Sequence, residues 1–198
     1  MDQKIKVAVI GTGALGKHHA RIYAELAKEG LIECVGVYDQ NISAAKEVAN
    51  QHRIPLLQTM EEATEFAHAL SVVTPTITHF SIASGLLEKG KHLLVEKPMT
   101  DNTEQAKHLV ELACKKNCVL QIGHVERFNP VFTYLNASAK EPKFIETHRL
   151  SPYPARSTDI GVVLDLMIHD LDIVLAFVKS SVVPVSYTHL RAHETDSY

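Results

Sequence analysis

The sequence predicts an α/β fold that begins with a doubly wound parallel sheet. Short apolar runs alternate with helical patterns over residues 4–123, and a glycine-rich turn directly follows the first run. Strands that alternate with helices on this scale form parallel sheets with helices on both faces, and right-handed crossovers wind such sheets doubly. After Gly123 the alternation stops. We therefore expect one domain over residues 1–123 and the start of a second, α+β domain after it.

Five apolar runs have the length of a buried strand, and the segments between them have helical spacing. The predicted strands are 4–10, 32–39, 69–73, 92–96 and 119–123, and the predicted helices are 15–29, 43–52, a short helix after residue 59, 78–89 and 102–116. Thr59 with Glu62, and Asn102 with Gln105, have the spacing of helix-capping pairs. Each of the first four predicted strands leads into a helix, as the crossovers of a parallel sheet require.

The second part of the chain is shorter and less regular. It predicts a helix after Asn129-Pro130, a strand over 143–150, a proline-rich turn over 151–155 and a strongly apolar helix over 161–178. We interpret residues 124–183 as the incomplete opening of an α+β domain. Residues 184–198 have no helical or strand period and resemble a translated adaptor sequence. We therefore expect a non-native tail on a truncated chain, with a disordered natural tail as the alternative.

Composition is that of a soluble globular protein. Of the 198 residues 45% are hydrophobic and 22% charged, and the net charge of −3 gives no reason to expect nucleic acid or an anionic membrane as a partner. There is neither a run of 18 apolar residues nor a signal-peptide pattern, so we expect a cytoplasmic protein. The 12 histidines are scattered, so we expect no metal site. Cys34, Cys114 and Cys118 are interpreted as reduced packing thiols, although the last two lie four residues apart in a segment of helical pattern.

The turn after the first predicted strand has the pattern of a dinucleotide phosphate site. Residues 11–16 form a G-x-G-x-x-G between a strand and a helix. Gly11 permits the tight turn, Gly13 lets the backbone approach a pyrophosphate, and Gly16 lets the helix pack closely on the strand. The alternative is a glycine turn that only reverses the chain. We expect free N–H groups at the helix start to bind the phosphates, with the site formed by Gly11, Thr12, Gly13, Ala14, Leu15 and Gly16.

An acidic residue stands where such a fold binds the adenosine ribose. Asp39 ends the second predicted strand, where a carboxylate accepts hydrogen bonds from both ribose hydroxyls. It would also repel a 2′-phosphate, and the next residue is Gln40 rather than arginine. The sequence therefore predicts a Rossmann domain that binds NAD rather than NADP.

Three further motifs occur in order along the chain: Thr74-Pro75 with His79, Glu96-Lys97-Pro98, and Asp165 with His169. They resemble the T-P-x-x-x-H loop, the E-K-P motif and the D-x-x-x-H catalytic pair of the glucose–fructose oxidoreductase / inositol dehydrogenase family (Gfo/Idh/MocA). The resemblance covers about residues 4–183, and Thr76 stands where many members have Asn. It implies an NAD-dependent oxidoreductase in which the first motif, Glu96 and Lys97 lie against the nicotinamide half of the cofactor.

The same residues suit the oxidation of a secondary alcohol, which needs hydride transfer and removal of the hydroxyl proton. Asp165 and His169 are four residues apart, so on a helix they share one face and can meet. A carboxylate that orients an imidazole raises its basicity, which suits His169 as general base. Lys97 could stabilise the developing alkoxide at the carboxyl edge of the sheet. The alternatives are a surface lysine and a satisfied polar pair in a buried helix, and Asp170 and Asp172 also lie nearby.

A dense polar patch follows the last predicted strand, and we expect its residues His124, Arg127 and Asn129 to face the substrate. Arg127 could bind a carboxylate or phosphate with both arms of its guanidinium, or could instead brace an interdomain hinge. The phrases GHVERFNP and THRLSPYP resemble the branch of the family that acts on UDP-linked N-acetylhexosamines. The resemblance thus implies a sugar or nucleotide-sugar substrate.

Two other functions would share this cofactor site: a non-catalytic dinucleotide-binding regulator, and a reductase of another small carbonyl or imine. Regulators of this kind tend to lose the catalytic lysine and histidine, whereas Lys97 and His169 are present. The resemblance also implies a homo-oligomeric full-length protein with an open antiparallel sheet after the catalytic helix. A chain that ends near residue 183 would expose sheet edges and apolar surface. We expect it to bind NAD weakly or to aggregate, without useful turnover.

Overall fold

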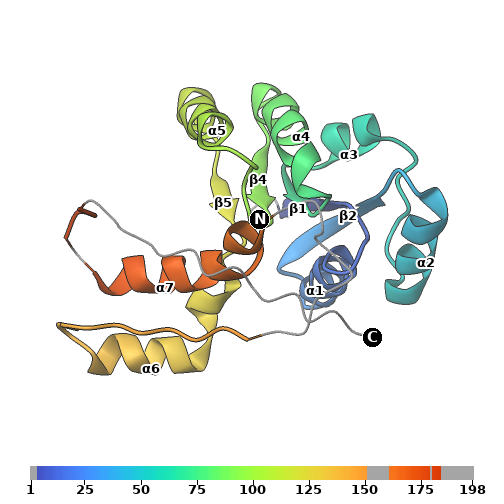
Figure 1. The fold of residues 1–198 in the computed structure, drawn as a ribbon. Helices are drawn as coiled ribbons and strands as arrows, with labels where there is room; N and C mark the ends of the chain where they lie inside the picture. Colours follow the sequence, from blue (N-terminus) through green and yellow to red (C-terminus); the bar gives the residue numbers. More distant parts are fainter. Residues whose placement is uncertain (1–3, 151–160, 179, 184–198) are drawn as a thin grey trace, which may run out of the picture.

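A five-stranded sheet forms the centre of the first part of the chain (Figure 1). The computed structural model describes residues 4–150, 161–178 and 180–183. All neighbouring strands are parallel and the order is β2-β1-β3-β4-β5, so the chain winds outward from β1 in both directions. This confirms the predicted doubly wound sheet. The strands are β1 (Ile5–Ile10), β2 (Ile32–Tyr38), β3 (Ala69–Val72), β4 (His92–Val95) and β5 (Leu120–Ile122).

Five helices cover the two faces of the sheet: α1 (Gly16–Lys28), α2 (Ile42–His52), α3 (Met60–Phe66), α4 (Thr76–Glu88) and α5 (Thr103–Lys116). Helices α1 and α2 pack on one face, and α3, α4 and α5 pack on the other (Figure 1). Successive residues of a strand point to opposite faces, so Val9 joins the core under α1 and α2 while Ile10 joins the larger core under the other three helices. The inner strands β1 and β3 are therefore buried on both sides over most of their length, whereas β2 and β5 at the edges of the sheet are only partly buried.

The helix starts follow the capping signals of the sequence. Thr59 accepts a hydrogen bond from the backbone N–H of Glu62, and Asn102 accepts one from that of Gln105. The carboxylate of Glu62 completes the first cap by accepting from the N–H of Gln58, one residue before the residue expected for a capping box. Helix α4 begins at residue 76 rather than at the predicted residue 78, and Pro75 precedes it as the N-cap with an extended ψ of 142°.

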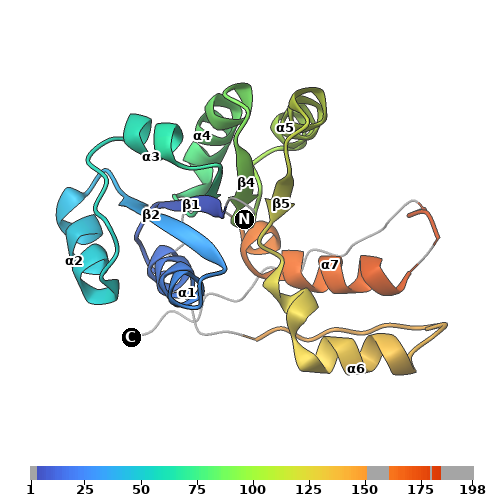
Figure 2. The same ribbon diagram turned by 180° about the vertical axis from the view of Figure 1, so that it is seen from behind.

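The second part contains helices and, over residues 124–150, 161–178 and 180–183, no added strand. It comprises the short 3-10 helix η1 (Val125–Phe128), α6 (Pro130–Ser138), a π-helical turn (Val163–Met167) and α7 (Ile168–Phe177). Helices α6 and α7 lie side by side in both views, and the rings of Phe132 and Phe177 are 5.5 Å apart (Figures 1 and 2). The predicted strand over 143–150 is wrong: these described residues have no strand pairing. A strand needs a neighbour for its N–H and C=O groups, and the five strands of the sheet provide none here.

Some expectations fall on residues 151–160 and 184–198, namely the proline-rich turn and the non-native tail, which lie outside the described residues. The three cysteines are free thiols. The packing interpretation fails for Cys114, which is exposed on α5, and Cys118 lies beyond the end of that helix. Over the described ranges, no helix has the length and apolar character needed to cross a membrane.

Candidate active site

A cavity of about 660 Å³ lies at the carboxyl edge of the sheet. Its walls come from the start of α1, the segments that follow β3, β4 and β5, and the π-helical turn with the start of α7. Ligands of doubly wound sheets bind at this edge, where the strand order reverses beside β1. Ten of the sequence-predicted residues line the cavity: Gly13, Ala14, Leu15, Thr74, Pro75, His79, Glu96, Lys97, Asp165 and His169.

The three glycines of the G-x-G-x-x-G turn differ in what an added side chain would meet. Gly11 has φ +94°, and a Cβ there would lie 2.5 Å from the carbonyl oxygen of Val73. A Cβ at Gly16 would overlap the carbonyl oxygen of Gly11. Only open space lies beyond Gly13, which lines the cavity. A pyrophosphate can therefore approach the backbone at Gly13, so these residues fit a dinucleotide.

Asp39 is held at the end of β2 by the same turn. Its Oδ2 accepts hydrogen bonds from the backbone N–H of Thr12 at 2.7 Å and from the Thr12 hydroxyl at 3.0 Å, and its Oδ1 accepts from the N–H of Asn41 at 2.8 Å. The N–H of Thr12 is thus directed at Asp39 rather than into the cavity. A carboxylate has about four lone-pair positions, so Asp39 keeps acceptor capacity for ribose hydroxyls.

His79 braces two loops of the cavity. Its ring is 1% exposed, with Nδ1 2.9 Å from the carbonyl oxygen of Pro98 and Nε2 2.8 Å from that of Thr74. A neutral imidazole donates to one of these oxygens, and a protonated one donates to both. The histidine of the T-P-x-x-x-H pattern therefore ties its own loop to the E-K-P segment.

Lys97 and Asp165 form a mostly buried ion pair in the cavity wall. The Lys97 ammonium donates to the backbone carbonyl oxygen of Asp165 at 2.7 Å and to its Oδ1 at 3.1 Å. An ammonium has three N–H donors, so one remains for a ligand.

The predicted contact between Asp165 and His169 is wrong. Within the described part of the chain, Nδ1 of His169 is buried and has no hydrogen-bond partner, while the carboxylate of Asp165 lies against Lys97. The four-residue spacing aligns side chains on an α-helix, but Asp165 lies in a π-helical turn, whose wider repeat changes that alignment.

The surroundings of His169 favour its neutral form. Burial lowers the pKa of the imidazole, and the positive charges of Lys97 and Arg149 lower it further, against a smaller opposing effect of Glu126. A histidine whose pKa is depressed stays unprotonated near neutral pH and can accept a proton. Lys97 and His169 line the same cavity, so an ammonium and a proton acceptor face one space.

Comparison with known proteins agrees with this geometry. Residues 5–124 match the Gfo/Idh/MocA family, described as an oxidoreductase family with an NAD-binding Rossmann fold. The chain belongs to this family. It is 40% identical over 182 residues to UDP-N-acetylglucosamine 3-dehydrogenase of Acidithiobacillus ferrooxidans, a match that covers 91% of the chain and 56% of the relative. It is 27% identical over 204 residues to scyllo-inositol 2-dehydrogenase (NAD(+)) of Bacillus subtilis, covering 94% and 57%.

Solved structures of family members show the same fold. The UDP-N-acetylglucosamine 3-dehydrogenase of Acidithiobacillus ferrooxidans superposes with a TM-score of 0.80 at 40% identity, over 89% of this chain and 57% of that one. GenD2 from gentamicin A biosynthesis, solved in complex with NAD, gives a TM-score of 0.64 at 28% identity, over 70% and 40%. The matches therefore cover about 56–57% of the two dehydrogenases named above and 40% of GenD2, so the chain spans only part of the length of these relatives. As in the family, its cofactor is NAD.

The predicted substrate residues of this Gfo/Idh/MocA protein do not line the cavity. Arg127 directs both arms of its guanidinium at Asp172, at 2.7 and 2.8 Å, and so braces η1 against α7. Asn129 caps α6 by accepting from the N–H of Val131. His124 lies with Nδ1 3.9 Å from Asp172. Of the two interpretations of Arg127, the structure favours the brace.

Sequence reasoning missed several residues that do line the cavity: His18, His19, Ile22, Glu126 and Arg149. Arg149 directs its guanidinium at Asp170 at 2.9–3.1 Å, across 21 residues of sequence. It lies in a segment without regular structure, so no local pattern marks it. His19 follows Gly16 by nearly one helical turn on α1, a spacing that could have indicated a side chain facing the same edge of the sheet.

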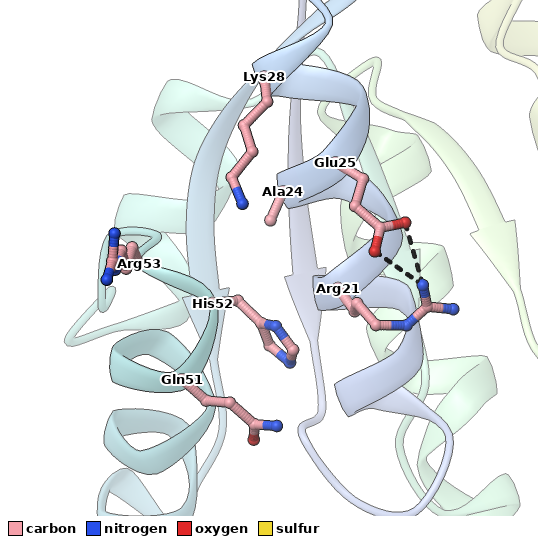
Figure 3. A pocket seen from close by; sticks show the side chains of 7 residues that line it. All are labelled: Arg21, Ala24, Glu25, Lys28, Gln51, His52 and Arg53. Atoms are coloured by element: carbon pink, nitrogen blue, oxygen red, sulfur yellow. Dashed lines mark hydrogen bonds and ion pairs between the residues drawn. The ribbon is translucent and has the colours of Figure 1, made fainter.

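A second, smaller hollow of about 250 Å³ lies between α1 and α2 and shares no residue with the cavity (Figure 3). Basic side chains dominate its lining, among them Lys28, His52 and Arg53, while Arg21 is paired with Glu25 at 2.8 Å. None of the family motifs reaches it.

Proposed function

We propose that the protein is an NAD-dependent dehydrogenase that oxidises the 3-hydroxyl of UDP-N-acetylglucosamine. The observation that carries the proposal is the convergence of Lys97, Asp165 and His169 on the cavity that Gly13 opens into. The substrate is supported by the 40% identity to UDP-N-acetylglucosamine 3-dehydrogenase, which extends over 91% of the chain. A regulator that only binds the dinucleotide would have no use for this mostly buried ion pair beside an imidazole whose Nδ1 has no partner among the described residues.

The proposed chemistry divides between two side chains. His169, kept neutral by burial and by neighbouring positive charge, accepts the proton of the substrate hydroxyl. The free N–H of Lys97 donates to the same oxygen and stabilises its developing negative charge. When bound, NAD accepts the hydride that leaves the carbon as the carbonyl forms. Asp165 positions the ammonium, a role that replaces the expected orientation of the imidazole.

We assign the cofactor contacts by the same geometry. The N–H groups of Ala14 and Leu15, at the start of α1, face the pyrophosphate, and Asp39 accepts from the adenosine ribose. Thr74 and Pro75, held by His79, lie against the nicotinamide half. Residues 124–183 then form the start of the substrate-binding part. We also propose that the intact protein is a homo-oligomer, as the resemblance to the family implies.

The test is to incubate the intact protein with UDP-N-acetylglucosamine and NAD and to follow NADH by absorbance. Mass spectrometry should show a sugar that has lost two hydrogen atoms. His169→Asn should lower kcat about 10²–10⁴-fold, since a general base contributes that much. Lys89→Met, which removes an exposed lysine beyond α4, should have no effect. NADH formation from free inositol or glucose but not from the nucleotide sugar would refute the substrate, and no NADH from any of them would refute the dehydrogenase.

A further inference from the structure

A network of polar side chains runs from the cavity wall, at His19 and Glu96, toward the sheet, and the proposed chemistry makes no use of it. His19 of α1 places Nε2 3.1 Å from Oε1 of Glu96 and Nδ1 3.2 Å from the hydroxyl oxygen of Ser71 on β3. The phenol of Tyr23 lies 2.7 Å from the same Ser71 oxygen. This network of hydrogen bonds ends at the backbone N–H of Lys97, which donates to Oε2 of Glu96 at 3.2 Å.

We propose that His19 is a positioning residue that fixes the Glu96 carboxylate and, through it, the backbone that carries the Lys97 ammonium into the cavity. The inference rests on the proposed function for the task of Lys97, but not for the contacts themselves. His19 and Glu96 are 15% and 9% exposed at their side chains, so their hydrogen bond is largely shielded from water. Ser71 is fully buried.

The direction of the hydrogen bonds follows from the charge on Glu96. Burial opposes ionisation of this carboxyl, but the hydrogen bond and charge of His19, followed by the N–H and charge of Lys97, hold its pKa below the ordinary value. A carboxylate only accepts, so Nε2–H of His19 donates to it. When the ring is neutral, Nδ1 then accepts from the hydroxyl of Ser71, whose oxygen accepts from Tyr23. When the ring is protonated, Nδ1–H donates to the Ser71 oxygen instead. Burial raises the pKa of Tyr23, which keeps its phenol protonated and able to donate.

Gly123 closes the other side of the Glu96 carboxylate. A Cβ added at Gly123 would lie 2.6 Å from Oε1 of Glu96, so the carboxylate occupies the space that a side chain would take. The carboxylate is therefore held between the ring of His19 and the main chain after β5. Gly123→Ala should displace it without touching His19, and this gives a second and independent way to disturb Lys97.

The experiment compares His19→Ala, His19→Gln and Lys17→Ala in the intact protein. Loss of one hydrogen bond to a buried charge should lower kcat about 10–100-fold in His19→Ala, with KM changed less than about twofold. The glutamine amide can still donate to Glu96, so His19→Gln should recover most of the activity. Lys17→Ala removes an exposed charge from the same helix and should change neither constant. Gly123→Ala should show the same kcat loss as His19→Ala.

A spectroscopic measurement separates this inference from the proposed function. In 15N-labelled protein, the ring nitrogens of His19 should show a proton on Nε2, and Glu96→Gln should shift the Nε2 resonance. That result would stand even if no substrate were turned over. A proton on Nδ1 with an unprotonated Nε2, a full kcat in His19→Ala, or a lost kcat in both His19 variants together with an equally lowered melting temperature would each overturn the positioning role.

Discussion

Lys97 and His169 reach one cavity from distant parts of the chain, and each depends on its neighbours for its chemical state. Lys97 follows β4 and directs two N–H groups at Asp165. His169 is the second residue of α7 and has an unpaired, buried Nδ1 among the described residues. The carboxylate of Asp165 contacts Lys97 and therefore does not raise the basicity of the imidazole. Lys97 is thus held as an ammonium and His169 as a neutral imidazole before any ligand binds.

The imidazole of His169 should titrate below the ordinary value for histidine. Burial and the charges of Lys97 and Arg149 disfavour its protonated form. At pH values between the pKa of the folded state and the ordinary value near 6.5, the unfolded chain binds more protons at this residue than the folded chain does. The contribution of His169 to the free energy of unfolding therefore falls as the pH drops through that window. An NMR titration of the ring should show this midpoint. Arg149→Met should raise it and Arg53→Met should not; an unmoved midpoint in Arg149→Met would contradict the assignment.

Asp39 should determine the choice between NAD and NADP. Asp39→Asn keeps the shape of the side chain but removes the charge that repels a 2′-phosphate and weakens the acceptor for ribose hydroxyls. Hydrogen bonds to a charged group contribute about 1.5–3 kcal/mol, so NAD should bind about 10-fold more weakly or worse, while NADP binding should improve relative to it. Calorimetric titration with both dinucleotides measures this ratio. Glu47→Gln on the outer side of α2 is the matched control, and an unchanged NAD/NADP ratio in Asp39→Asn would argue against this role.

At the scale of single elements, the sequence predicts the helices and strands whose position depends on nearby residues alone. The five strands and α1 to α5 appear with small shifts at their ends, because apolar alternation, helical spacing and caps such as Thr59 and Asn102 are local signals. The expected strand over 143–150 fails because pairing depends on a distant neighbour. The Asp165–His169 contact fails for a related reason: four-residue spacing implies an α-helix, and the chain forms a π-helical turn there.

The end of α2 offers a gain in stability. Arg53 has φ 56° in the left-handed region, which costs a residue with a side chain about 1–2 kcal/mol. Arg53→Gly removes that cost and adds some entropy to the unfolded chain, so the free energy of unfolding should rise by about 0.5–1 kcal/mol. Urea unfolding measures it. Asn117→Gly, at the equivalent end of α5, should gain less, because Asn tolerates this conformation. A lower free energy of unfolding in Arg53→Gly would show that the Arg53 side chain stabilises the fold by more than its left-handed conformation costs.

At the scale of the whole molecule, the sequence motifs predict where the cavity lies but not all of the residues that line it. Each motif lies beside a strand end or a helix start, and parallel strands bring such ends to one edge of the sheet. Arg149 and Glu126 arrive from segments whose position depends on packing between α7 and the chain after β5. No periodicity encodes that packing. The residues predicted to meet the substrate, such as Arg127, accordingly brace this part instead.

The two parts of the molecule differ in how they cover apolar surface. The sheet buries residues on both faces, with Val9 and Ile10 almost fully enclosed. Beyond β5, Phe128 is 81% exposed, Phe144 82% and Leu150 95%. Monomeric proteins rarely leave large apolar patches in water, and these three large apolar side chains are almost fully exposed. The 198-residue chain should therefore associate with itself at about micromolar concentrations and above, the range in which exposed apolar surface drives aggregation.

Sedimentation velocity over a concentration series tests this expectation, together with fluorescence of a dye that binds apolar surface. The double variant Phe128→Glu/Phe144→Glu should shift the chain toward monomer and reduce dye binding. Phe66→Glu removes a half-exposed aromatic ring from α3, on the covered sheet, and should leave association unchanged. If all three proteins sediment as monomers, the exposed side chains beyond β5 do not drive association. If Phe66→Glu is as effective as the double variant, the effect follows from added negative charge rather than from the apolar surface beside α6 and α7.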